Sequence, residues 1–114
     1  MKDLTSLDDL DDVLGQSQQQ PVMLFKHSTR CPRSAAADEQ YRQFAAGNDD
    51  GNVLFTHLDL IAHRDVSNAI AKRTKVWHQS PQAILVVAGD AVWSATHEDI
   101  TVDSLKAAVN EHTS

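Results

Sequence analysis

The sequence predicts an α/β fold, a four-stranded mixed sheet covered by helices on both faces. Short apolar runs bounded by turn residues alternate along the chain with segments of helical periodicity. Strands that alternate with helices pair in parallel through right-handed crossovers. Near the C-terminus, a glycine turn joins two β-rich runs, which adds an antiparallel hairpin. At 114 residues, the chain is expected to form a single domain over residues 1–114.

The first element is predicted to be a short helix. Leucines recur at the three- and four-residue spacing of a helical stripe, at Leu4, Leu7, Leu10 and Leu14. Gly15 stands where this helix is expected to end. A polar run and Pro21 then lead into VMLFKH, residues 22–27, which is too short for a helix and indicates a buried strand.

The second helix is predicted to start at Pro32 and to stop at Gly47. Its apolar face is formed by residues at four- and three-residue spacing, Ala37, Tyr41 and Phe44. The run NDDGN, residues 48–52, has the composition of a turn. The alternating and branched residues of VLFTHLDL, residues 53–60, then indicate the second strand.

The C-terminal half is predicted to contain a helix, a hairpin and a last helix. Asp65 is a candidate N-cap for a helix with the buried stripe Val66, Ala69 and Ile70. Two β-rich runs, residues 82–88 and 91–97, flank the turn Gly89-Asp90. Thr101 is expected to cap the last helix, whose inner face carries Val102, Leu105 and Val109.

The charge and apolar content of the chain limit its expected partners and location. Ten Lys and Arg residues against sixteen Asp and Glu residues give a net charge of −6, which disfavours nucleic acid and anionic membranes as partners. No run has the length of a membrane span, and the N-terminus is acidic where a signal peptide is basic. We therefore expect a cytoplasmic protein.

Cys31 is the only cysteine, and it lies in KHSTRCPRS, between the first strand and the second helix. Pro32 fits the first helical position, because its missing N–H costs nothing there. The unpaired N–H groups at a helix start favour a thiolate, and such settings lower a cysteine pKa from about 8.5 to roughly 3.5–7.5. We expect Cys31 to be a nucleophile at neutral pH, and a buried, inert cysteine is the alternative.

The neighbours of Cys31 define the expected chemistry. Arg30 and Arg33 are expected to stabilise the thiolate together with the helix start at Pro32. Ser34 stands where a dithiol enzyme carries its second cysteine, so the motif predicts one-thiol transfer rather than dithiol reduction. The Ser34 hydroxyl is either a hydrogen-bond donor to the thiolate or an ordinary residue of the first helical turn. Sequence alone favours a trans Ser80-Pro81 bond at the start of the third strand.

Three segments together resemble one family. KHSTRCPRS, WHQSPQAILV and VVAGDAVWSATHEDIT are similar to motifs of the YtxJ family of thioredoxin-like proteins, the monothiol bacilliredoxins. The resemblance runs from about Val22 to about Val109. The matching positions are Cys31, Ser67, Asn68, Ile70, Ala71, Ser80, Pro81, Gln82, Val92, Trp93, His97, Ile100 and Thr101. Arg33 departs from the family pattern, which has an apolar residue there, and Thr96 replaces a serine.

The resemblance implies a thioredoxin fold, a cis Pro81 facing Cys31, and removal of bacillithiol from S-bacillithiolated client proteins. It makes Cys31 the attacking residue. The candidate substrate-binding residues are His27, Thr29, Ser80, Pro81 and Gln82. No bound cofactor is expected, since bacillithiol or another small thiol is the co-substrate. A second thiol or a reductase would release the thiol taken up by Cys31.

Other functions stay open at this point. The six histidines show no paired ligand spacing, so no metal site is expected. A dimer with one cysteine per chain is able to carry an iron-sulfur cluster, in which case protein purified without oxygen would be brown. A stress adaptor without turnover would show the alkylation profile of an ordinary thiol.

Overall fold

A mixed five-stranded sheet lies between two layers of helices in the computed structural model, which describes residues 1–48 and 50–113. The strands are β1 (Lys2–Asp3), β2 (Val22–His27), β3 (Leu54–Asp59), β4 (Gln82–Val87) and β5 (Asp90–Thr96). The helices are α1 (Leu7–Gln16), α2 (Pro32–Ala46), α3 (Arg64–Thr74) and α4 (Val102–Thr113), with a 3-10 turn at His97–Asp99. The strand order is β1-β3-β2-β4-β5.

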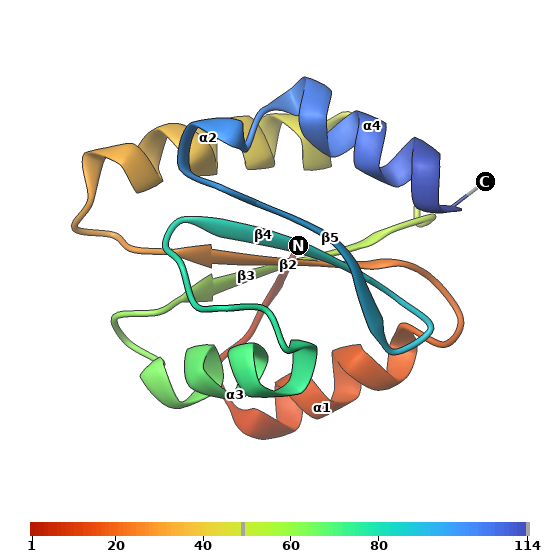
Figure 1. Ribbon diagram of the computed structural model, residues 1–114, viewed down its shortest axis with the longest axis horizontal. Helices are drawn as coiled ribbons and strands as arrows, with labels where there is room; N and C mark the ends of the chain where they lie inside the picture. The colour runs from red at the N-terminus through yellow and green to blue at the C-terminus, as the bar shows by residue number, and fades with distance from the viewer. Residues whose placement is uncertain (49, 114) are drawn as a thin grey trace.

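Helices α2 and α4 cover one face of the sheet, and α1 and α3 cover the other (Figure 1). Alternation along the strands divides the apolar residues between two cores. In β2, Met23 and Phe25 join the core under α2 and α4, while Leu24 joins the core over α1 and α3. Phe25 stacks on Tyr41 of α2, with the ring centroids 4.4 Å apart. Because both faces are buried, β2 is apolar throughout its first four residues, as expected for a central strand.

The register of the sheet brings the loop after β2 and the loop before β4 to the same edge. Strand β2 is parallel to β3 and antiparallel to β4, and Lys26 pairs with Gln82. The C-terminal end of β2 therefore lies beside the first residue of β4. Cys31 follows β2 by four residues, and Pro81 immediately precedes β4. This places the two segments that the sequence singles out at one end of the sheet.

The prediction of four strands misses β1. Lys2 and Asp3 pair in parallel with Thr56 and His57, and the Leu4 N–H donates to the His57 carbonyl at 2.9 Å. A two-residue strand is too short to show a period-two pattern, so nothing in the sequence marks it. The mixed sheet with helices on both faces is confirmed.

Helix α1 begins and ends later than predicted. Ser6 is its N-cap and accepts a hydrogen bond from the Asp9 N–H, so Leu4 lies outside the helix, directly after β1. Gly15 lies inside the helix, and Leu7 is 47 % exposed rather than part of the buried stripe. The buried residues of α1 are Leu10, which the predicted stripe includes, and Val13, which it does not. The leucine spacing alone did not show which residues of α1 face the core.

The cap of α3 also differs from the prediction. His63 occupies the N-cap position, and Asp65 lies in the first turn, where its charge is favourable to the helix dipole. The predicted hairpin is present, but its turn lies at Ala88-Gly89, one residue before the predicted Gly89-Asp90, because Asp90 pairs with Val87 as the first residue of β5. Ala88 and Gly89 both have positive φ, 52° and 83°, as the two-residue hairpin turn requires. Thr101 Oγ1 accepts from the Ser104 N–H at 3.0 Å and so caps α4.

The predicted turn at residues 48–52 includes Asp49, which lies outside the described residues; within it, Gly51 has a φ of 86°. Among residues 1–48 and 50–113, no helix combines the length and the apolar character needed to span a membrane.

Candidate functional site

Cys31 is the N-cap residue of α2. Its backbone is extended, with φ −111° and ψ 120°, and its carbonyl accepts the first helical hydrogen bond from the Ala35 N–H at 3.1 Å. Pro32 occupies the first helical position, as predicted. The residue is partly exposed, and its side chain makes no capping hydrogen bond. The partial exposure contradicts the alternative of a buried, inert cysteine.

The electrostatic setting of Cys31 favours negative charge. The first turn of α2 contains no acidic residue, so the unpaired N–H groups at the helix start meet no carboxylate from their own helix. Arg33 lies in that turn and is exposed, and Arg30 is exposed in the preceding loop. Attraction to the Cys31 charge is the smallest of the causes that raise the pKa of Arg33.

Glu98 is the main partner of Arg33, a contact that no sequence pattern predicted. Arg33 Nε and Nη2 donate to the two Glu98 carboxylate oxygens, each at 2.8 Å. The Glu98 hydrogen bond raises the pKa of Arg33, and the same contact lowers the pKa of Glu98. Part of the positive field predicted for Arg33 is therefore neutralised by Glu98. Sixty-five positions separate the two residues, so no local pattern could reveal the pair.

Ser34 holds the loop together rather than contacting the thiol. It is fully buried, and its Oγ accepts a hydrogen bond from the Ser28 N–H at 2.9 Å. The same oxygen lies 2.8 Å from Nδ1 of His27. The predicted hydrogen bond to Cys31 is not formed, because the hydroxyl points back into the fold. Ser34 thus shapes the loop that carries Cys31 and connects it to the end of β2.

The predicted substrate-binding residues differ in how accessible they are. Thr29 is exposed, whereas His27 is 9 % exposed and Gln82 only 1 %. Gln82 donates from Nε2 to the Trp77 carbonyl at 2.9 Å, a contact that fixes the loop before β4. His27 and Gln82 are therefore built into the protein interior, because each lies on a central strand covered by a helix.

The Ser80-Pro81 peptide bond is cis, as the resemblance implies and contrary to the expectation from sequence alone. The Pro81 carbonyl accepts a hydrogen bond from the His97 N–H at 3.2 Å. The Ser80 Oγ and the Gln82 Oε1 are buried and have no hydrogen-bond partner among the described residues. In the part of the chain that the structure describes, the Ser80 backbone also forms no hydrogen bond.

The Lys26 side chain is buried on the face of β2 opposite to that of its neighbour His27. Its Nζ donates to Nδ1 of His78 at 3.2 Å, and the Ser67 hydroxyl lies 3.4 Å from the same nitrogen. Burial lowers the pKa of Lys26 to about 8. Burial, followed by the nearby Lys26 charge, lowers the pKa of His78, which keeps this imidazole a neutral acceptor. No sequence pattern predicted this cluster, since a lysine in an apolar run is usually expected to reach solvent.

Lys26 makes the stability of the fold depend on pH. Its pKa is about 8 in the folded chain against an ordinary value of 10.5, so the unfolded chain binds more protons between these pH values. The free energy of unfolding should therefore rise as the pH increases from about 8 toward 10.5. Urea titrations across this range should show the rise in the wild type and its loss in Lys26→Met. Lys106→Met, at an exposed lysine of α4, should retain it; an equal rise in Lys26→Met would contradict this account.

Comparison with known proteins agrees with this architecture. Among solved structures, a candidate oxidoreductase with a thioredoxin fold is 38 % identical, with a TM-score of 0.84, and the match covers 94 % of this chain and 91 % of the other. A thioredoxin from Fasciola hepatica is 12 % identical, with a TM-score of 0.79 and coverage of 99 % and 100 %. A thioredoxin from Malassezia sympodialis is 15 % identical, with a TM-score of 0.77 and coverage of 100 % and 91 %. The two thioredoxins, at such low identity, show the fold alone.

A family model described as monothiol bacilliredoxin BrxC matches residues 2–105. The bacilliredoxin part of the expected resemblance is thereby confirmed, while the match does not carry the YtxJ name. The family and the 38 % identical oxidoreductase together support a thiol redox role. Since the family model matches nearly the whole chain, this protein belongs to the monothiol bacilliredoxin BrxC family.

Proposed function

We propose that this protein removes bacillithiol, or a similar small thiol, from mixed disulfides on client proteins through Cys31. The observation that carries the proposal is the position of a partly exposed cysteine at the N-cap of α2, in a chain without a second cysteine. The helix start favours the thiolate, which is the form that attacks a disulfide. The absence of a second thiol limits the chain to one-thiol exchange.

The proposed reaction is a single thiol-disulfide exchange. The Cys31 thiolate attacks the sulfur of the small thiol in the mixed disulfide, and a new S–S bond forms as the old one breaks. The electron pair of the broken bond leaves with the client cysteine, which becomes a thiolate and takes a proton from water. No net oxidation occurs in this step. A second small thiol or a partner reductase then attacks the adduct on Cys31 and restores the free thiolate.

The segment before β4 offers a docking place for the client chain. The unpaired Ser80 backbone is suited to accept an extended chain as a short antiparallel partner. Trp77, three residues earlier, is 89 % exposed. It borders a groove of about 590 Å³ that Lys72 and Lys75 also line. Exposed aromatic and basic side chains at this point favour contact with a client surface over an isolated structural role.

The small thiol is proposed to occupy a cavity beside the start of α2. This cavity has a volume of about 460 Å³, and its lining includes Pro32, Arg33, His97 and Glu98. In the free protein, the Arg33 guanidinium donates two hydrogen bonds to the Glu98 carboxylate. A carboxylate on the small thiol would compete with Glu98 for the same two N–H donors of Arg33. The Arg33–Glu98 pair would thus set how strongly an anionic thiol is recognised.

Glu98→Gln should increase the transfer rate for a mixed disulfide with a carboxylate-bearing thiol, by roughly up to fivefold, because it frees Arg33 from an exposed ion pair. Arg33→Ile should lower that rate by a similar factor. Neither change should affect a mixed disulfide with uncharged 2-mercaptoethanol, and added salt should reduce both effects. The measurement is the initial rate of thiol release at low and high ionic strength. Unchanged rates in Arg33→Ile would dispose of a role for Arg33 in recognition.

The direct test of the proposed function is release of bacillithiol from a bacillithiolated client, compared with release of glutathione from the same client cysteine. The proposal predicts turnover of the bacillithiolated client by wild-type protein when a regenerating thiol is present. Preference for the glutathionylated client would assign a different small thiol. No release from either client would overturn the proposal.

A further inference from the structure

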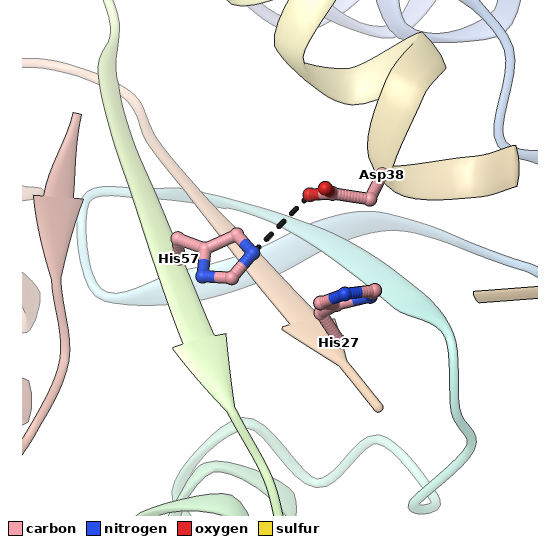
Figure 2. Close-up of side chains that lie close together, drawn as sticks. All are labelled: His27, Asp38 and His57. Carbon is pink, nitrogen blue, oxygen red and sulfur yellow. Dashed lines mark hydrogen bonds and ion pairs between the residues drawn. The ribbon is translucent and has the colours of Figure 1, made fainter. Parts of the chain in front are cut away.

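Three metal-ligating side chains converge between the sheet and α2 (Figure 2). His27 ends β2, His57 lies on β3, and Asp38 reaches toward them from the second turn of α2. One ligand atom from each side chain lies within 4.8 Å of the other two. The expectation of no metal site rested on spacing along the sequence, and it missed this group because its members come from three separate elements.

The distances suit a small ion. His57 Nε2 and Asp38 Oδ1 are 3.2 Å apart. Two ligands on a tetrahedral zinc ion, each with a bond of about 2.0–2.1 Å, stand about 3.3 Å apart. The pair therefore already has the separation that a shared ion requires. His27, whose ring centroid is 5.4 Å from that of His57, would need to shift by roughly 1–2 Å to complete three bonds of that length.

Each ligand is chemically prepared for an ion. The Nδ1 atom of His27 is held by the Ser34 hydroxyl at 2.8 Å, which leaves Nε2 as the free ring nitrogen. His57 Nε2 faces Asp38 Oδ1 and can offer its lone pair to an ion once its proton moves to Nδ1. Asp38 Oδ2 accepts a hydrogen bond from Arg42 at 2.9 Å, which leaves Oδ1 to face the histidines.

The group is also reachable from solvent. A cavity of about 330 Å³ adjoins it, and His57 is part of its lining together with Thr29, Arg42 and Asp59. The Arg42 side chain, which pairs with Asp38, is 54 % exposed. Two nearly buried histidines and one carboxylate form a donor set typical of zinc.

We propose that His27, Asp38 and His57 bind one divalent transition-metal ion, with zinc as the preferred ion, at a site separate from the thiol of Cys31. The proposal does not rest on the proposed function, because it is argued from the geometry of these three side chains alone.

Zinc titration of the Cys31→Ser variant by calorimetry, after treatment with a chelator, tests the proposal without interference from the thiol. We expect one equivalent of zinc to bind, and Asp38→Asn and His27→Gln in the same background to weaken binding by at least tenfold. His112→Gln, which changes a histidine near the C-terminal end of α4, is the matched control and should bind like the parent. Zinc should also raise the melting temperature of the parent variant and leave that of Asp38→Asn unchanged.

Two outcomes would overturn the proposal. If wild-type protein binds zinc and Cys31→Ser does not, the thiol holds the ion. If Asp38→Asn and His27→Gln bind zinc as tightly as their parent, the ion lies elsewhere. A spectrum of wild-type protein loaded with cobalt adds an independent readout. Visible ligand-field bands without a thiolate charge-transfer band support the nitrogen and oxygen ligands named above. His27→Gln changes a nearly buried residue, so Asp38→Asn decides the question should that variant fail to fold.

Discussion

Replacing Cys31 by serine should reduce the release of small thiol from a bacillithiolated client to the rate seen without protein. Serine has nearly the same shape but cannot form the thiolate that attacks sulfur. Since no other cysteine exists in the chain, no second thiol can substitute for it. The measurement is the initial rate of thiol release at equal concentrations of wild-type and variant protein.

A loss of activity is informative only if the fold survives. Cys31 is partly exposed and makes no capping hydrogen bond, so Cys31→Ser should change the free energy of unfolding by less than about 0.5 kcal/mol. Ser34→Ala is a contrasting variant. It retains the nucleophile but removes the hydroxyl that accepts the Ser28 N–H, and it should lower stability while leaving some activity. Full activity in Cys31→Ser would place the chemistry outside Cys31.

Phe25→Ala should lower the free energy of unfolding by about 3–5 kcal/mol. Phe25 is fully buried at the centre of β2 and stacks on Tyr41, with ring centroids 4.4 Å apart. Its removal leaves a cavity between the sheet and α2 that neighbouring side chains can fill only partly. A domain of this size has a total stability of about 5–15 kcal/mol, so the variant should lie close to the limit of folding.

Denaturant titration followed by circular dichroism provides the measurement. Leu7→Ala is the matched control, because Leu7 is apolar and helical but 47 % exposed; it should cost less than about 1 kcal/mol. Equal losses for Phe25→Ala and Leu7→Ala would contradict the placement of the core. They would instead support the leucine stripe expected from the sequence.

The parts of the fold that the sequence predicted well are those with strong local signals. VMLFKH became β2 at residues 22–27, and α2 starts at Pro32 as its proline and apolar face predicted. The hairpin formed one residue before its predicted turn, at Ala88-Gly89, because these two residues adopt the positive φ that the turn needs. In contrast, β1 is too short for a pattern, and Leu4 satisfied the helical spacing although it lies outside α1.

The sequence predicted only those features of the site that depend on neighbouring residues. The position of Cys31 at the start of a helix followed from Pro32 and the preceding strand. The contacts beside Cys31 and in the two buried clusters join distant positions: Arg33 with Glu98, Lys26 with His78, and the histidine–aspartate group under α2. Single-sequence periodicity contains no information on such pairs. Ser34 shows a related limit, because its residue type suited a bond to the thiolate while the fold directed its hydroxyl toward His27.

The central claim is that Cys31 itself takes up the small thiol. Intact-protein mass spectrometry, with wild-type protein mixed with a bacillithiolated client and no regenerating thiol, tests it most directly. The account predicts a mass increase equal to one bacillithiol, located on Cys31, together with a client that has regained its free cysteine. A covalent adduct between Cys31 and the client, or release of bacillithiol with no adduct on Cys31, would contradict it.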